Sequence, residues 1–153
     1  MIKLKFVTIF FLFIFLFQSN VFAKQNKYSE CLKSADIGDF ISNEKYSGID
    51  YENIEVQKAE PICLDALNNF PNDVKILRSL GRIYFKNKSF KESLEFYFKA
   101  SKLGDAFSFY RLSEAYRFGL GVEIDYKKAF QYILKSKQKG HSYALEEIGE
   151  YYK

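Results

Sequence analysis

One short pattern occurs twice in this chain at a spacing of 36 residues, and this repetition restricts the possible folds more than any other feature. Each copy begins with a glycine and places small residues, an aliphatic residue and a tyrosine at the same intervals. The matched pairs are Gly104 and Gly140, Ala106 and Ser142, Ser108 and Ala144, Leu112 and Ile148, Ser113 and Gly149, and Tyr116 and Tyr152. A fixed period of about this length is typical of stacked helical hairpins. We therefore predict an all-α fold, an α-solenoid of such hairpins.

A glycine-rich turn between the two copies adds a family resemblance. The segment resembles the Sel-1-like repeat, a relative of the tetratricopeptide repeat. The resemblance rests on Leu112, Tyr116, Gly119, Gly121, Val122, Asp125, Lys128, Ala129, Gly140 and Ala144, with Ser113 and Ser136 where the family usually has Gly and Ala. It implies a repeat domain over residues 55–153, clearest at 104–140. It also implies a protein-protein interaction adaptor or scaffold rather than an enzyme.

The apolar spacing and the capping residues predict where the helices of this domain lie. We expect helices over residues 55–69, 73–86, 89–102, 106–118 and 125–137, and a closing helix from residue 142. Asp73 and Asp125 are placed to cap two of them, because an aspartate at a helix start accepts bonds from unpaired backbone amides. Ser89 and Glu92 have the spacing of a capping box at a third.

The first 23 residues have the pattern of an export signal. Lys3 and Lys5 precede the apolar run Phe6–Phe17, which is too short for a bilayer core that needs about 20 residues. Ala23 then supplies a small residue for cleavage, so the mature chain is expected to begin near Lys24. The alternative is an uncleaved membrane anchor. We expect an exported protein, periplasmic or secreted, with no membrane span after cleavage.

Removal of this segment leaves 21 basic and 19 acidic residues, a net charge of +2. A nucleic-acid-binding domain is usually far more basic, with its charges clustered on one face. We therefore expect no nucleic acid among the partners.

Residues 24–54 contain several turn-forming pairs and are predicted to form an irregular, largely coil segment, with at most a helical turn around residues 28–34. Cys31 lies in this segment and Cys63 beyond it, and they are the only cysteines in the chain. In an exported protein such a pair is by default a disulfide, with a metal pair or a reactive thiol as alternatives. The spacing of Ile54, Ala59, Pro61 and Cys63 also resembles the region before the repeats in some exported bacterial Sel-1-like proteins, which supports the pairing.

Catalytic patterns are weak in this sequence. His141 is the only histidine, and no nucleophile motif surrounds any serine. Gly119 and Gly121 lack the further residues of a phosphate-binding loop. We predict no catalytic residue, no metal site and no cofactor. The alternative is an envelope enzyme, or a protein that recognises peptidoglycan or β-lactams, because some cysteine-rich Sel-1-like relatives have been linked to such compounds.

The family resemblance also implies where a protein or peptide partner binds. In such repeats the first helix of each hairpin lines the concave side, and helical geometry places certain offsets from the conserved aliphatic residue on one face. The predicted partner-binding residues are Lys75, Arg78, Arg82, Phe107, Tyr110, Glu114, Arg117, Tyr143 and Glu146, and the same offsets add Phe85, Glu150 and Lys153. This predicted face is basic at one end, aromatic in the middle and mostly acidic at the other.

Overall fold

The structure, a computed structural model, describes residues 2–37, 49–141, 144 and 148. Helices are the only regular elements within these ranges, in agreement with the predicted all-α class. They are α1 (Ile2–Ala35), the short 3₁₀ helix η1 (Tyr51–Asn53), α2 (Val56–Asn69), α3 (Val74–Lys86), α4 (Phe90–Lys102), α5 (Ala106–Phe118) and α6 (Tyr126–Gln138). The five helices expected between residues 55 and 138 are present, with ends shifted by a residue at most.

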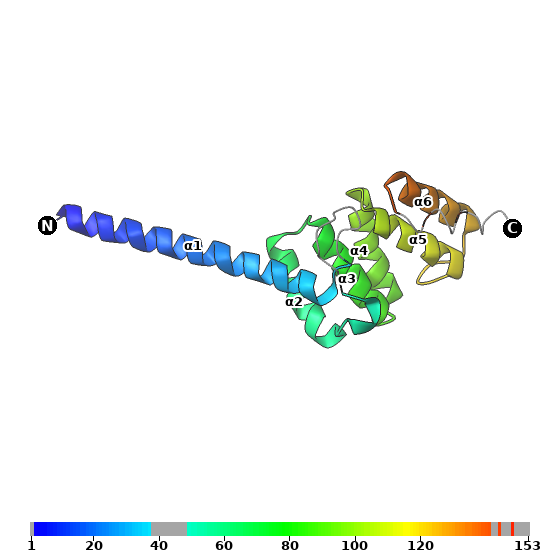
Figure 1. The fold of residues 1–153 in the computed structure, drawn as a ribbon, viewed down its shortest axis with the longest axis horizontal. Coiled ribbons are helices and arrows are strands. Elements are labelled where there is room, and N and C mark those ends of the chain that lie inside the picture. Colours follow the sequence, from blue (N-terminus) through cyan, green and yellow to red (C-terminus); the bar gives the residue numbers. More distant parts are fainter. Residues whose placement is uncertain (1, 38–48, 142–143, 145–147, 149–153) are drawn as a thin grey trace.

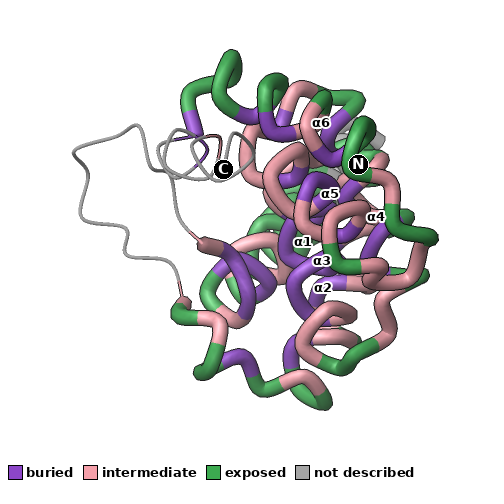
Figure 2. The backbone as a smooth tube through the Cα atoms, turned by 90° about the vertical axis from the view of Figure 1, so that its right-hand side faces the viewer, coloured by how far each residue is buried: buried purple, intermediate pink, exposed green. Residues whose placement is uncertain are grey.

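Two helical hairpins form the body of the repeat domain. Helix α3 pairs with α4, α5 pairs with α6, and α4 packs on α5 to join the hairpins (Figure 1). Buried Leu80 and Leu112 occupy the same place in the two units. Helix α3 is the most enclosed, because every residue from Ile76 to Ile83 is buried. The buried backbone accordingly gathers toward the middle of the bundle (Figure 2).

Helix α1 departs from the coil predicted for the region after residue 23. It projects from the body over most of its length, and only its last turns pack on α2 and α3 (Figure 1). Cys31, Leu32 and Ala35 are buried there, at the spacing of one helical face. This buried stripe explains why residues 24–35 are helical throughout, so the prediction of at most one helical turn in a largely coil stretch is wrong here. Residues 38–48 of the predicted irregular segment lie outside the described residues.

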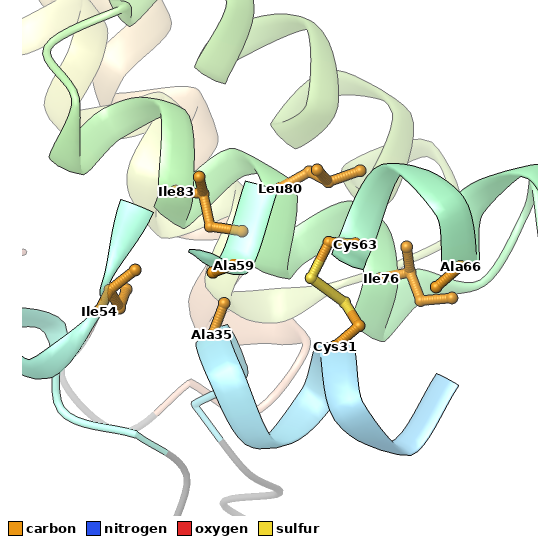
Figure 3. Close-up of a cluster of buried hydrophobic side chains, with 9 residues drawn as sticks. All are labelled: Cys31, Ala35, Ile54, Ala59, Cys63, Ala66, Ile76, Leu80 and Ile83. Carbon is orange, nitrogen blue, oxygen red and sulfur yellow. A yellow bond between two sulfur atoms is a disulfide. The ribbon is translucent and has the colours of Figure 1, made fainter. Parts of the chain in front are cut away.

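A disulfide between Cys31 and Cys63 fastens α1 to α2, as the sequence predicts. The two Cα atoms are 4.7 Å apart, and the bridge closes a sequence separation of 32 residues. It lies in an apolar cluster formed by residues of α1, α2, α3 and the segment before α2 (Figure 3). That cluster comprises Cys31, Ala35, Ile54, Ala59, Cys63, Ala66, Ile76, Leu80 and Ile83. The end of α1 thereby takes the place of a first helix beside α2.

Aspartates cap three of the helices, as short polar side chains at these positions can do. The carboxylate of Asp73 accepts bonds from the amides of Lys75 and Ile76, and that of Asp125 accepts one from Lys128. Asp105 caps α5 in the same way. The predicted capping box at the start of α4 is wrong, because the Ser89 side chain makes no capping bond.

The loop from α5 to α6 turns at two glycines. Gly119 and Gly121 have φ angles of 72° and 77°, a left-handed conformation that glycine adopts without steric cost. A side chain at Gly121 would also meet the backbone of Phe90 at 2.9 Å. The glycine-rich motif is therefore a packed turn between neighbouring hairpins.

Two further expectations concern the ends of the chain. Of the closing helix predicted from residue 142, only Ala144 and Ile148 lie among the described residues, and both are helical. Within the part of the chain that the structure describes, no helix combines the length and apolar character of a membrane span. Cleavage near Lys24 remains a prediction.

Candidate binding surface and cavity

Arg78, one of the predicted partner-binding residues, is buried in a charge network inside the protein. Its Nε and Nη2 donate to Oδ1 of Asp36 at 3.0 and 2.7 Å, and its Nη1 donates to Oδ1 of Asp105 at 3.0 Å. Asp105 uses its other oxygen to hold the amide and hydroxyl of Ser108 at the start of α5. Arg78 therefore ties the end of α1 to the second hairpin through α3.

Burial raises the pKa of the Asp36 carboxyl, although Arg78 opposes the shift. The second carboxylate oxygen of Asp36, Oδ2, is buried without a hydrogen-bond partner among the described residues. Asp36 is consequently a fully buried carboxyl group, although it directly follows the end of a helix.

Arg82, one turn further along α3, is buried and binds backbone carbonyls instead of carboxylates. Its Nη1 donates to the oxygen of Ala35 at 2.5 Å, and its Nη2 donates to that of Ile49 at 2.8 Å. Burial lowers the pKa of the Arg82 guanidinium to about 10, so it still carries its charge at neutral pH.

The prediction that Arg78 and Arg82 face a partner is therefore wrong. Helical spacing correctly places both on one face of α3, but Ala35, Asp36 and Ile49 of the same chain bind them there. Lys75, at the start of the face, is half-buried. Tyr143, Glu146, Glu150 and Lys153 lie outside the described residues.

The equivalent face of α5 is partly exposed. We call Phe107, Tyr110, Glu114 and Arg117 the α5 surface; all four are half-buried. The ring of Tyr110 stacks on that of His141, with 4.8 Å between centroids, and Phe107 lies 5.9 Å from the same ring. The structure thus places Phe107 and Tyr110, the aromatic residues in the middle of the predicted face, around the ring of His141.

A cavity of about 280 Å³ separates the covered face of α3 from the α5 surface. Its lining comes from the N-terminal segment and from α3, α4 and α5. The lining residues are Ile37, Tyr51, Arg82, Phe85, Tyr97, Phe107 and Arg111. The guanidinium of Arg111 lies over the Phe85 ring, 3.9 Å from its centroid, and its Nη1 binds Glu114 at 2.5 Å. The cavity therefore has aromatic walls and two cationic side chains.

Two polar atoms at this cavity have no hydrogen-bond partner among the described residues. They are the hydroxyl of Tyr97 and Nε of Arg111, and both are buried. Burial raises the pKa of the Tyr97 hydroxyl to about 12, so it stays protonated and able to donate.

Sequence reasoning missed Tyr51, Tyr97 and Arg111 as site residues. Tyr97 is buried in the core of the repeat domain, and its side chain also lines the cavity. Arg111 follows Phe107 by four residues, a spacing that places both on neighbouring turns of one helix face and could have indicated it. Tyr51 has no such signal, because only the folded chain places it beside Phe85, with ring centroids 6.0 Å apart.

The described residues contain no cluster of three or more metal-ligating side chains. His141 packs against Phe107 and Tyr110, and burial lowers its pKa although Asp105 opposes the shift. The region therefore combines an aromatic patch on α5 with an adjoining cavity lined mainly by aromatic side chains.

Neither models of known families nor curated proteins give a match to this sequence. Among solved structures, the crystal structure of a Sel1 repeat protein from Oxalobacter formigenes is similar, with a TM-score of 0.56 and 22% sequence identity. The similarity covers 64% of this chain and 41% of that chain, so this chain spans less than half of that protein's length. An identity of this size bears on the fold alone. The chain has the helical fold of a Sel1 repeat protein.

Proposed function

We propose that the protein is an exported adaptor of the cell envelope that binds a protein or peptide partner on the α5 surface. The helical-repeat fold supports an interaction role, because stacked hairpins offer extended surfaces to other chains. The basic and apolar start of the chain supports export. A disulfide at Cys31 and Cys63 suits an oxidising compartment.

The observation that carries the proposal is that the first hairpin binds a segment of its own chain on the corresponding face. The face of α3 holds a polypeptide segment: Arg78 binds a carboxylate and Arg82 binds two backbone carbonyls of that segment. The α5 surface is the same face one repeat later, with Tyr110 at the position of Arg78 and Glu114 at that of Arg82. Its half-buried aromatic rings are the kind of anchor that dominates protein interfaces.

Capture from envelope extract tests the binding part of the proposal. The purified protein should retain one or more specific proteins, Tyr110→Ala should lose them, and Tyr110→Phe should keep them because the ring is restored. Gln131→Ala, at an exposed position of α6, is the matched control. Retention of the same proteins by Tyr110→Ala would contradict the assignment of this surface, as would failure of the captured protein to bind when purified.

A fusion of the first 30 residues to a reporter that is active only outside the cytoplasm tests export. Activity together with an N-terminus near Lys24 is the expected result. An active fusion with an intact N-terminus would replace cleavage with anchoring, and an inactive fusion would contradict export.

A further inference from the structure

The cavity between α3 and α5 has the properties of a site for a small anionic group. Its volume of about 280 Å³ lies just below the roughly 300–1,000 Å³ of typical ligand pockets. It is therefore suited to one side chain or one chain terminus rather than to a whole cofactor. Its walls come from four separate parts of the chain, so the fold rather than one loop defines it.

Arg82 differs from the other buried guanidiniums near the cavity in that no carboxylate contacts it directly within the described ranges. Arg78 is paired with Asp36 and Asp105, and Arg111 is paired with Glu114. The hydrogen-bond partners of Arg82 are the neutral carbonyls of Ala35 and Ile49. A buried guanidinium without a counter-charge is costly, and a carboxylate brought beside it would relieve that cost.

The unpartnered donors point to the same chemistry. The Tyr97 hydroxyl and Nε of Arg111 make no hydrogen bond of good geometry within the described part of the chain, although buried donors in proteins are nearly always paired. The two side chains are close enough to each other for the Arg111 guanidinium to oppose the rise in the Tyr97 pKa. Both belong to residues that line the cavity. A carboxylate accepts hydrogen bonds at two oxygens and so can satisfy both donors.

The remaining lining is apolar, which suits a carboxylate that is attached to an apolar part of a polypeptide. Phe85 and Phe107 form aromatic walls, and Ile37 adds an aliphatic one. Phe107 also belongs to the α5 surface, so a chain bound on that surface would lie beside the cavity.

We propose that this cavity binds a carboxylate of a polypeptide partner, with Arg82 and Arg111 as counter-charges and Tyr97 as hydrogen-bond donor. The inference rests on the proposed function for the identity of the partner as a polypeptide. The carboxylate belongs either to a chain terminus or to an Asp or Glu side chain, and the experiment separates these sources.

Direct binding of small probes tests the site without any partner protein. N-acetylphenylalanine offers a terminal carboxylate, and the α-amide of N-acetylglutamate offers a side-chain carboxylate. The neutral counterparts are N-acetylphenylalanine amide and N-acetylglutamine amide. Titrations followed by the Arg Nε–H and Tyr ring NMR signals of the purified protein should show at least one carboxylate binding tenfold or more tightly than its amide. The acid that binds more tightly identifies the source.

Tyr97→Phe is the decisive variant, because it removes one hydroxyl and keeps the packing ring. It should weaken binding of the carboxylate about tenfold, the expected loss of one hydrogen bond to a charged acceptor. It should leave the urea midpoint of the free protein unchanged or raised, since the lost donor has no partner there. Tyr132→Phe, on α6 and away from the cavity lining, should alter neither quantity. Arg111→Gln should abolish the preference for acid over amide.

Equal binding of acids and amides, unperturbed cavity signals, or unchanged affinity in Tyr97→Phe would each overturn the inference. Capture of the envelope partner without any probe binding would overturn the carboxylate site and leave the proposed adaptor role intact. Probe binding that depends on Tyr97, combined with no partner capture, would support the site and contradict the adaptor role.

Discussion

Arg78 on α3 and Asp36 just after α1 are 42 residues apart in the sequence and share two buried hydrogen bonds, of 3.0 and 2.7 Å. Together with the disulfide, this pair holds the N-terminal segment across the first repeat face. That face is consequently closed by the chain itself, whereas the residues of the α5 surface are half-buried.

Asp36→Asn should destabilise the protein by about 3 kcal/mol, because removing one partner of a buried ion pair leaves the other charge poorly compensated. Asp105 still binds Arg78 in this variant, which keeps the loss at the lower end of the usual range. Urea unfolding at pH 7 measures the effect. Asp50→Asn is the control, since Asp50 is exposed and its side chain makes no capping bond. Equal midpoints for the two variants would show that the network does not hold the segment.

Loss of the disulfide should lower stability by roughly 3 to 4 kcal/mol in the chain-entropy account of a 32-residue separation. For a domain of this size that corresponds to a fall of roughly 10 °C in melting temperature. Calorimetry with and without reductant measures it, and the Cys31→Ala/Cys63→Ala variant should not respond to reductant. Two free thiols in unfolded, unreduced protein would contradict the bridge.

Close packing at Gly81 and Ser113 should make larger side chains costly. A Cβ at Gly81 would lie 2.5 Å from the ring of Tyr97, which is fully buried. We expect Gly81→Ala and Ser113→Leu to destabilise by roughly 1 to 3 kcal/mol through overpacking. Ser113→Ala is the size-matched control for the second variant. Unchanged urea midpoints would show that a larger side chain fits at these positions and would contradict the close packing.

His141 should make stability depend on pH below neutrality. Its pKa in the folded protein is lowered from 6.5 by burial, so the unfolded chain takes up a proton first as the pH falls. The stabilising contribution is complete above about pH 6.5 and is lost as the pH falls toward and through the folded pKa. Urea midpoints should therefore drop more between pH 7.5 and 5.0 for the native protein than for His141→Phe, which keeps a ring against Tyr110. Parallel pH profiles would contradict a buried, neutral His141.

The hairpins could be predicted from the sequence because their signals are local. Asp73 and Asp125 cap helices where the apolar periodicity begins, and Gly119 ends α5 in a left-handed turn. Such signals depend only on neighbouring residues, and the predicted helix ends are correct for that reason.

The covering of α3 could not be predicted in the same way. Helical spacing shows that Arg78 and Arg82 share a face but not what packs on it, and their partners lie 42 and 47 residues away. The sequence predicts only a helical turn at the end of α1, because the buried stripe of Cys31, Leu32 and Ala35 spans little more than one turn. The cavity depends on four segments meeting and has no local signal at Tyr51.

Photo-crosslinking from single positions tests the central claim that the α5 surface binds the partner. A benzophenone side chain placed at Tyr110 or Glu114 should crosslink one envelope protein in extract, whereas the same group at the exposed positions Glu95 of α4 or Gln131 of α6 should not. Crosslinks from Glu95 or Gln131, with none from Tyr110 or Glu114, would place the partner on the opposite side of the hairpins and contradict the account.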